Sequence, residues 1–206
     1  MSRMLVVRVW LPDRPGALGQ VASRIGAVHG DVTAIDILER GAGRVIDELV
    51  VSLPDSASEE LLAKEIGAVD GVAVEHIRPV GEQRADSATA ILEVAATVAD
   101  TAPGARLATL VDGLLGAFDS DWAVAIGGGE LLHRAGNPPE LGWLIAFLEG
   151  CEHLDATTAS VAPGDVMWAR LPRTGIAIAV GRAQRPVHER ERGRVELLAR
   201  ITDALI

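Results

Sequence analysis

The sequence has little of what several classes of protein require. It contains one cysteine, Cys151, in 206 residues, so no disulfide can form within the chain and a reducing compartment is expected. No apolar run approaches the roughly 20 residues that cross a bilayer, and the N-terminal segment has no small-residue cleavage site of the secretory type. These absences predict a cytoplasmic protein with no membrane partner.

Basic charge is also scarce. The chain carries 19 basic residues against 29 acidic ones, which gives a formal net charge of −10. A protein that binds DNA or RNA neutralises phosphates with a basic surface. The acidic balance therefore predicts no nucleic-acid partner.

Apolar residues, in contrast, make up 49% of the chain, which is enough to bury a substantial core. The polar stretch GEQR at 81–84 separates two long series of apolar segments and is the best candidate for a linker. We therefore expect two domains, residues 1–80 and residues 85–206.

The first domain begins with an apolar run at 4–11 that predicts a strand, followed by PDRPG at 12–16, which predicts a turn. Gly30 stands where a left-handed C-cap would end the helix that follows. That helix is expected because apolar residues recur with helical spacing. They are Leu18, Val21, Ala22, Ile25 and Val28.

Two β-branched runs, at 32–38 and 45–53, flank the sequence Gly41-Ala42-Gly43 and predict a hairpin. Ser56 and Glu59 match the capping box of a second helix, and 72–77 alternates like a strand. The order β-α-β-β-α-β predicts an α+β, ferredoxin-like domain with both helices on one face of the sheet. The other face then needs cover from a second copy or another domain.

The hexapeptide DRPGAL at 13–18, together with Gly30 and this element order, resembles the signature of ACT domains. The resemblance covers residues 4–80. It implies a regulatory domain in which the first loop and the start of the second strand, often from a neighbouring subunit, bind an amino acid. On this chain the implied ligand-binding residues are Leu11, Asp13, Gly16, Ala17, Leu18, Asp31 and Val32.

The chemistry of this loop suits such a ligand. Gly16 lets a ligand approach the backbone, and the N–H groups of Gly16, Ala17 and Leu18 at a helix start would stabilise a carboxylate. Asp13 is placed to pair with an ammonium group, or alternatively to cap the helix. Val32 stands where amino-acid-binding members often carry a polar amide, which favours a second hypothesis, a dimerisation module without ligand.

The second domain is expected to have the order α-α-β-β-α-β-β-α. The predicted helices are 90–99, 107–118, 141–148 and 188–205, and the predicted strands are 122–126, 130–133, 166–171 and 175–180. This order and size are similar to those of GAF-type sensory domains. The resemblance implies a pocket between the sheet and helix 141–148, unless the aromatic side chains simply pack the core. The candidate lining residues are Trp122, Trp143, Phe147, Trp168 and Arg170.

Glycine and cysteine give no convincing catalytic motif. Gly127-Gly128-Gly129 lacks the Lys-Ser/Thr of a phosphate-binding loop and predicts a hairpin turn. Cys151 and His153 are neighbours i and i+2 at a helix end, a spacing that does not secure a nucleophile–base pair. Cys151 is expected to be a semi-buried apolar residue.

The remaining charged groups are also better explained without catalysis. Glu130 with His133 lacks a known metal-ligand spacing, and so does His188 with its neighbours Glu189 and Glu191. His29 and His76 have no evident partner. The arginine-rich stretch 182–194 is interleaved with glutamates and predicts ion pairs at i, i+4 on a solvated helix face. We therefore expect no catalytic residue, no metal and no cofactor.

These patterns predict a non-enzymatic regulatory homodimer. Its ligand would be an amino acid or a similar small metabolite, bound by the first domain, with allosteric signalling to the second. Two alternatives are an ACT-type dimerisation module without bound ligand and a small enzyme that uses the second domain.

Overall fold

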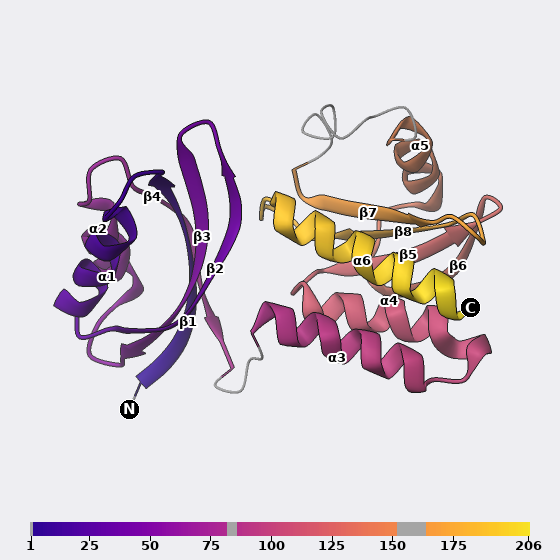
Figure 1. The fold of residues 1–206 in the computed structure, drawn as a ribbon, viewed down its shortest axis with the longest axis horizontal. Coiled ribbons are helices and arrows are strands. Elements are labelled where there is room, and N and C mark those ends of the chain that lie inside the picture. The colour runs from indigo at the N-terminus through magenta and orange to yellow at the C-terminus, as the bar shows by residue number, and fades with distance from the viewer. Residues whose placement is uncertain (1, 82–85, 152–163) are drawn as a thin grey trace. The chain divides into compact units, whose positions relative to one another are not determined.

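The computed structural model describes residues 2–81, 86–151 and 164–206. The chain divides into two compact units, Met1–Asp86 and Ser87–Ile206. Each unit is α+β and contains one four-stranded antiparallel sheet (Figure 1).

The first unit has the element order expected for a ferredoxin-like domain. Its elements are β1 (Ser2–Pro12), α1 (Ala17–Ala27), β2 (Asp31–Gly41), β3 (Arg44–Pro54), α2 (Glu59–Gly67) and β4 (Ala73–Val80). The strands are ordered β2-β3-β1-β4, and every neighbouring pair is antiparallel. This arrangement confirms the predicted split βαβ topology and is compatible with an ACT-type fold.

Both helices cover the same face of this sheet (Figure 1). The apolar stripes of α1 and α2 pack against alternate residues of β1 and β3, because strand side chains alternate between the two faces. The fully buried members of this core are Leu5, Val7, Val9, Val21, Ile25, Leu49, Val51, Leu53, Leu62 and Ile66. On the opposite face Arg8 pairs with Glu48 at 2.7 Å, and both side chains are buried.

The end of α1 differs in detail from the prediction. His29, at φ 61°, takes the left-handed position. The N–H of Gly30 donates to the carbonyl of Ile25 at 3.0 Å, as in a Schellman motif. Gly30 is required for another reason, because a Cβ on Gly30 would lie 2.8 Å from Cγ2 of Ile25. The prediction of a left-handed Gly30 was therefore wrong by one residue.

The start of α2 also differs. Its N-cap is Ser58, whose hydroxyl accepts from the N–H of Leu61 at 3.1 Å. The predicted cap, Ser56, lies in a turn closed by the N–H of Ala57 and the carbonyl of Pro54. The β2–β3 hairpin, in contrast, turns as predicted, with Ala42 and Gly43 both at positive φ.

The second unit confirms the predicted element order. It contains α3 (Ser87–Asp100), the short 3-10 helix η1 (Pro103–Ala105), α4 (Arg106–Ala117), β5 (Trp122–Gly127), β6 (Glu130–Gly136), α5 (Leu141–Cys151), β7 (Val166–Leu171), β8 (Ile176–Gly181) and α6 (Glu189–Leu205). The strands are ordered β6-β5-β8-β7 and are antiparallel. The resemblance of this unit to GAF domains remains a prediction.

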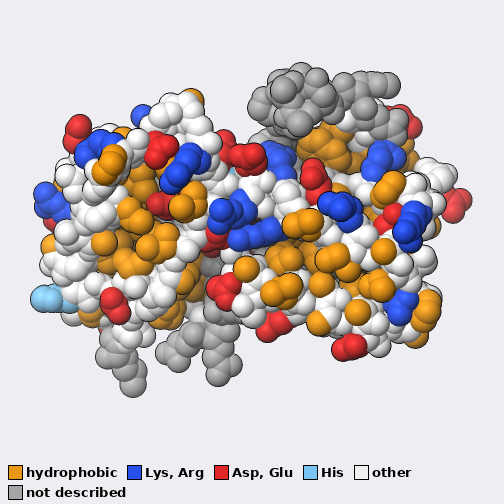
Figure 2. Space-filling model, in the orientation of Figure 1, with side chains coloured by type: hydrophobic (Ala, Val, Ile, Leu, Met, Phe, Trp, Pro, Cys, Tyr) orange, Lys and Arg blue, Asp and Glu red, His pale blue; other side chains and the backbone are white. Residues whose placement is uncertain are grey.

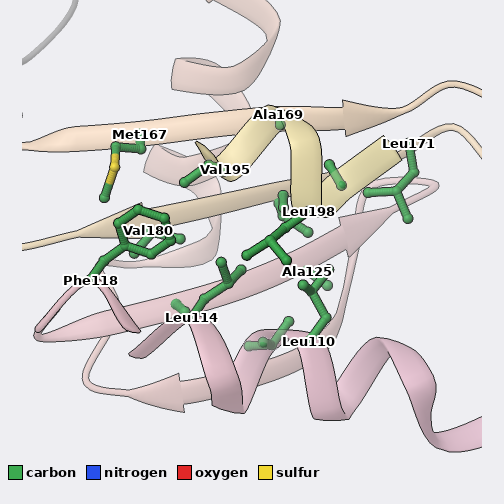
Figure 3. Close-up of a cluster of buried hydrophobic side chains, with 14 of the residues drawn as sticks. Leu110, Leu114, Phe118, Ala125, Met167, Ala169, Leu171, Val180, Val195 and Leu198 are labelled. Atoms are coloured by element: carbon green, nitrogen blue, oxygen red, sulfur yellow. The ribbon is translucent and has the colours of Figure 1, made fainter. Parts of the chain in front are cut away.

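Helices cover both faces of the second sheet. On one face α3, α4 and α6 enclose the larger core, in which Leu110, Leu114 and Leu198 lie against Ala125 and Val180 (Figure 3). On the other face α5 packs on a smaller cluster built around Trp122, Val124 and Ala179. The unit therefore has three layers.

The outer surface of the three-helix layer is partly apolar. Leu92 of α3 and Leu197 and Ile201 of α6 are all exposed, and Figure 2 shows hydrophobic and basic side chains side by side over these helices. None of the described helices is both long and apolar enough to cross a membrane.

Candidate functional site

The 13–18 loop joins β1 to α1 and leaves the start of the helix open. Gly16 is the N-cap at φ 86°, and no side chain caps the helix. This left-handed conformation favours glycine. The N–H of Ala17 is already used, because it donates to the carbonyl of Arg14 at 3.3 Å. In the described chain, no protein acceptor meets the N–H groups of Gly16, Leu18 and Gly19. Open amides are therefore present, as predicted, but Ala17 does not supply one.

Asp13 is part of the loop but does not cap the helix. Its backbone N–H donates to the carbonyl of Gly43 at 2.9 Å, which fastens the loop to the β2–β3 hairpin. Its carboxylate lies 3.8 Å from Nε of Arg40, and both side chains remain well exposed. The alternative in which Asp13 is the N-cap of α1 is therefore wrong, and the carboxylate is accessible to a ligand.

The apolar residues of the predicted site anchor the loop. Leu11 and Ala17 are 2% and 3% exposed, and Leu18 packs partly against the core of the first unit. Their side chains face inward, so only their backbone atoms are placed to meet a ligand. The rigid attachment of both ends of the loop fixes the direction of the open amides.

Asp31 and Val32 lie at the other end of the sheet from the loop. Asp31 is in register with Ser52, which is in register with Met4, whereas Pro12, at the loop, is in register with Arg44. The strand positions between Met4 and Pro12 correspond to about 26 Å. One chain therefore does not bring the predicted ligand-binding residues together, and a site that uses all of them needs a second copy.

Asp47 is a feature of this region that sequence reasoning missed. It pairs in register with Val9, whose side chain is in the helix-covered core, so Asp47 faces the same layer. It is 2% exposed, and its Oδ1 has no hydrogen-bond partner. Burial raises the pKa of the Asp47 carboxyl above its usual value, against the lowering effect of Arg40. The available signal was an acid inside the β-branched run 45–53.

Beside α5, where a pocket was predicted, aromatic side chains pack against one another. Trp143 and Phe147 stack with ring centroids 5.4 Å apart. Phe147 meets Trp168 edge to face at 5.3 Å, and Trp122 is buried in the same cluster. Trp122, Phe147 and Trp168 pack in or against the smaller core, as in the alternative interpretation, whereas Trp143 is 45% exposed. Of the predicted residues, Trp168 and Arg170 do line a pocket, and that pocket lies beside α6.

The nucleophile candidate Cys151 is largely buried. Cys151 is 7% exposed, and burial raises the pKa of its thiol, while Arg170 and Arg192 nearby lower it. A thiol that resists ionisation is a poor nucleophile. Its candidate partner His153 lies outside the described residues.

The histidines have structural partners or surroundings. His133 Nε2 lies 3.0 Å from Oδ1 of Asp112, and His188 forms a capping box with Glu191 at the start of α6. Burial and the charge of Arg8 lower the pKa of His76 to about 4, so this histidine is neutral near pH 7. Among the described residues, no group of three or more His, Cys, Asp or Glu side chains is arranged to hold a metal ion.

The arginine-rich stretch 182–194 is less exposed than predicted. Arg182 is 3% exposed and donates to Glu191 at 2.7 Å and to the carbonyl of Phe118 at 3.2 Å. Arg185 pairs with Asp119 at 2.6 Å. Arg182 and Arg185 therefore do not form the expected i, i+4 pairs on a solvated face, since both lie before α6 and tie its start to the loop after α4.

Comparisons with known proteins give distant likenesses only. No family model and no curated protein matches the chain. Solved structures with some likeness include an uncharacterized protein from Thermotoga maritima, 20% identical over 39% of this chain and 100% of its own, with a TM-score of 0.31. The ACT domain from GTP pyrophosphokinase of Chlorobium tepidum is 15% identical over 39% of this chain and 100% of its own, with a TM-score of 0.31.

A formyltetrahydrofolate deformylase from Pseudomonas putida is 19% identical, and the match covers 43% of this chain and 36% of the deformylase, with a TM-score of 0.31. The description of the first unit as ferredoxin-like therefore rests on its own strand order and not on these likenesses.

Proposed function

We propose that this chain is a regulatory protein whose first unit binds a free amino acid, or a similar zwitterion, at the 13–18 loop. The observation that carries the proposal is the uncapped start of α1. Gly16 turns the backbone with positive φ, no side chain occupies the capping position, and an exposed carboxylate stands beside it.

The two ends of a zwitterion match the two sides of this loop. The open N–H groups of Gly16, Leu18 and Gly19 and the positive end of the helix dipole favour a carboxylate. A Cβ on Gly16 would meet no atom within 4 Å, which leaves space above the bend. The exposed carboxylate of Asp13 then accepts from the ammonium group of the ligand.

A second copy of the chain would complete the site. Asp31 and Val32 lie too far from the loop in the same chain, but in a two-fold dimer the start of β2 of one copy can face the loop of the other. A ligand held between two copies links occupancy to their association. The regulatory output is a difference in the ligand's affinity for two arrangements of the dimer, which the second unit would sense.

Thermal unfolding with each of the twenty amino acids tests the binding. At about 100 times the dissociation constant a ligand stabilises the folded state by about 2.7 kcal/mol. Asp13→Asn should reduce this stabilisation strongly, whereas Glu60→Gln, which removes the charge of an exposed side chain on α2, should leave it unchanged. If no amino acid raises the unfolding temperature of the native chain at millimolar concentration, the proposal fails.

Mixing two variants tests whether the site is shared. If each site uses the loop of one copy and β2 of the other, Asp13→Asn and Asp31→Asn should each abolish binding alone. Mixed dimers would keep one intact site of two, so an equal mixture should recover about one quarter of the sites. No recovery on mixing would contradict a shared site.

The alternative is a dimerisation module without ligand. The observation in its favour is Val32, an apolar residue at the start of β2 that packs partly against the core. A module of this kind would form concentration-dependent dimers that no amino acid stabilises. The thermal experiment and a sedimentation measurement together separate the two functions.

A further inference from the structure

A pocket of about 600 Å³ lies in the second unit, at the edge of its sheet beside α6. The edge strand is β7, which pairs with β8. The lining residues are Cys151 at the end of α5, Trp168, Ala169, Arg170 and Pro172 on and after β7, and Glu196 and Arg200 on α6. A volume of this size is within the range of small-molecule sites, roughly 300–1,000 Å³.

The pocket has a charged rim and an apolar floor. Arg170, Arg200 and Glu196 are exposed at the rim, whereas Cys151 and Ala169 are buried. Among the described lining residues, two guanidinium groups stand beside one carboxylate, in a chain whose overall charge is −10. The spacing of Arg200 and Glu196, one helical turn apart on α6, places both over the same end of the pocket.

Trp168 supplies a flat surface with a fixed orientation. The guanidinium of Arg192 lies 5.9 Å from the centroid of the indole, and Phe147 packs edge to face against it. Arg192 is itself held, since it donates to the carbonyl of Val166 at 3.0 Å. A ring restrained in this way can receive an apolar or aromatic group without losing further conformational freedom.

We propose that this pocket binds a small organic anion, a carboxylate or phosphate that carries a flat apolar group. Arg200 and Arg170 receive the anionic group, because planar guanidinium groups match the oxygens of both carboxylates and phosphates. The apolar group lies against Trp168, above Ala169 and Cys151. Glu196 accepts from any hydroxyl or amine on the ligand.

The pocket is independent of the proposed function. It is formed by the second unit alone, and its ligand class differs from a free zwitterion held by backbone amides. Failure of amino-acid binding at the 13–18 loop would therefore leave the pocket untouched, and the reverse also holds.

The test measures the binding of four probes to the full chain by calorimetry. The probes are phenylacetate, phenyl phosphate, inorganic phosphate and phenethylamine. Phenylacetate or phenyl phosphate should bind measurably, and the stronger of the two identifies the anionic group. Inorganic phosphate should bind more weakly because it lacks the apolar group, and phenethylamine should not bind because it is a cation.

Arg200→Gln should weaken the binding of the better probe about tenfold, as expected for the loss of one charge-assisted hydrogen bond. The matched control is Arg134→Gln, which removes an exposed guanidinium from β6 at the opposite edge of the same sheet. The affinity of the Arg134→Gln variant for the better probe should be unchanged. The proposal is overturned if neither aromatic anion binds, or if both substitutions weaken binding equally, since that result would indicate a general charge effect.

Discussion

Each unit buries an aspartate, and the two aspartates have different surroundings. Asp203 in α6 is 3% exposed, and both of its oxygens accept from the N–H of Arg173, at 3.2 and 3.0 Å. Asp47 in β3 is 2% exposed, and its Oδ1 has no partner. The acid of the second unit fastens a helix to a turn, whereas the acid of the first unit is a local cost to stability.

The starts of α6 and α1 differ in the same direction, although α2 of the first unit is capped by Ser58 and α4 of the second unit has no side-chain cap. At α6, His188 and Glu191 form a capping box, and Glu191 also pairs with Arg182. At α1, the N-cap is a bare glycine and no side chain closes the helix. At these places the polar groups of the second unit are paired within the unit, whereas backbone N–H donors at the start of α1 in the first unit meet no protein acceptor among the described residues. Open donors on a rigid loop are what a ligand site requires.

The largest expected effect tests the tight packing of the second unit. A Cβ on Gly136 would lie 2.1 Å from the carbonyl oxygen of Asp121, and φ is 70°. Gly136→Ala should therefore lower the free energy of unfolding by about 3 kcal/mol or more, from overpacking and backbone strain together. Gly128→Ala is the control. Gly128 also has positive φ, but a Cβ there meets nothing within 4 Å, so a loss of about 1 kcal/mol is expected.

Urea denaturation of both variants measures this difference. Equal losses for Gly136→Ala and Gly128→Ala would mean that the close approach to Asp121 is relieved without cost, and the described packing would be wrong.

The next largest effect concerns the buried ion pair of the second unit. Glu191→Gln removes the charge that faces Arg182 at 2.7 Å. An uncompensated buried charge typically costs about 3–5 kcal/mol. The carbonyl of Phe118 still accepts from Arg182, so we expect a loss of about 3 kcal/mol, at the lower end of that range. Glu196→Gln, an exposed substitution on the same helix, should change stability by less than about 0.5 kcal/mol. Chemical denaturation checks both, and a small loss in Glu191→Gln would contradict the pairing.

A stabilising substitution is expected in the first unit. Asp47→Val replaces a buried acid, whose Oδ1 has no hydrogen-bond partner, with a β-branched residue suited to a strand. It should raise the free energy of unfolding by about 1–3 kcal/mol near pH 7. Burial raises the folded-state pKa of Asp47 above the ordinary value of 3.8. The native chain therefore loses stability as pH rises through the range between these two values, and the valine variant does not.

The gain from Asp47→Val should accordingly shrink below about pH 4, where the acid is protonated in both states. Denaturation of the two proteins across this pH range is the measurement. A gain that is independent of pH would show that the charge of Asp47 is not the cause.

The smallest effect distinguishes two serines two residues apart. Ser58→Ala removes the cap of α2 and should cost about 1 kcal/mol. Ser56→Ala, in the turn before it, should cost less than about 0.5 kcal/mol. Thermal unfolding of the pair decides whether the observed cap or the pattern Ser56–Glu59 is correct.

The sequence predicted the element order well because the apolar periodicities are strong and the turns carry glycine or proline. Its errors came where two neighbouring residues satisfy the same pattern. Ser56 and Ser58 are both good caps, and only the turn at Pro54 decides between them. His29 rather than Gly30 adopts positive φ, since Gly30 is needed for its close approach to Ile25.

The candidate site was predictable as a loop but not as a geometry. The DRPGAL pattern located the bend. No pattern could show that the carbonyl of Arg14 accepts from the N–H of Ala17, or that Asp31 lies at the far end of the sheet. The partners of buried charges also depend on tertiary packing. Asp47 and Arg182 therefore looked like ordinary members of a strand and a solvated helix.

The open amides at the start of α1 are tested most directly by following the backbone amides of the ¹⁵N-labelled chain by NMR during titration with amino acids. We predict that at least one amino acid, at about 10 mM or below, shifts the amide signals of Gly16, Leu18 and Gly19 more than those of the α2 start. Binding that leaves these three signals in place and moves others would contradict the proposed site.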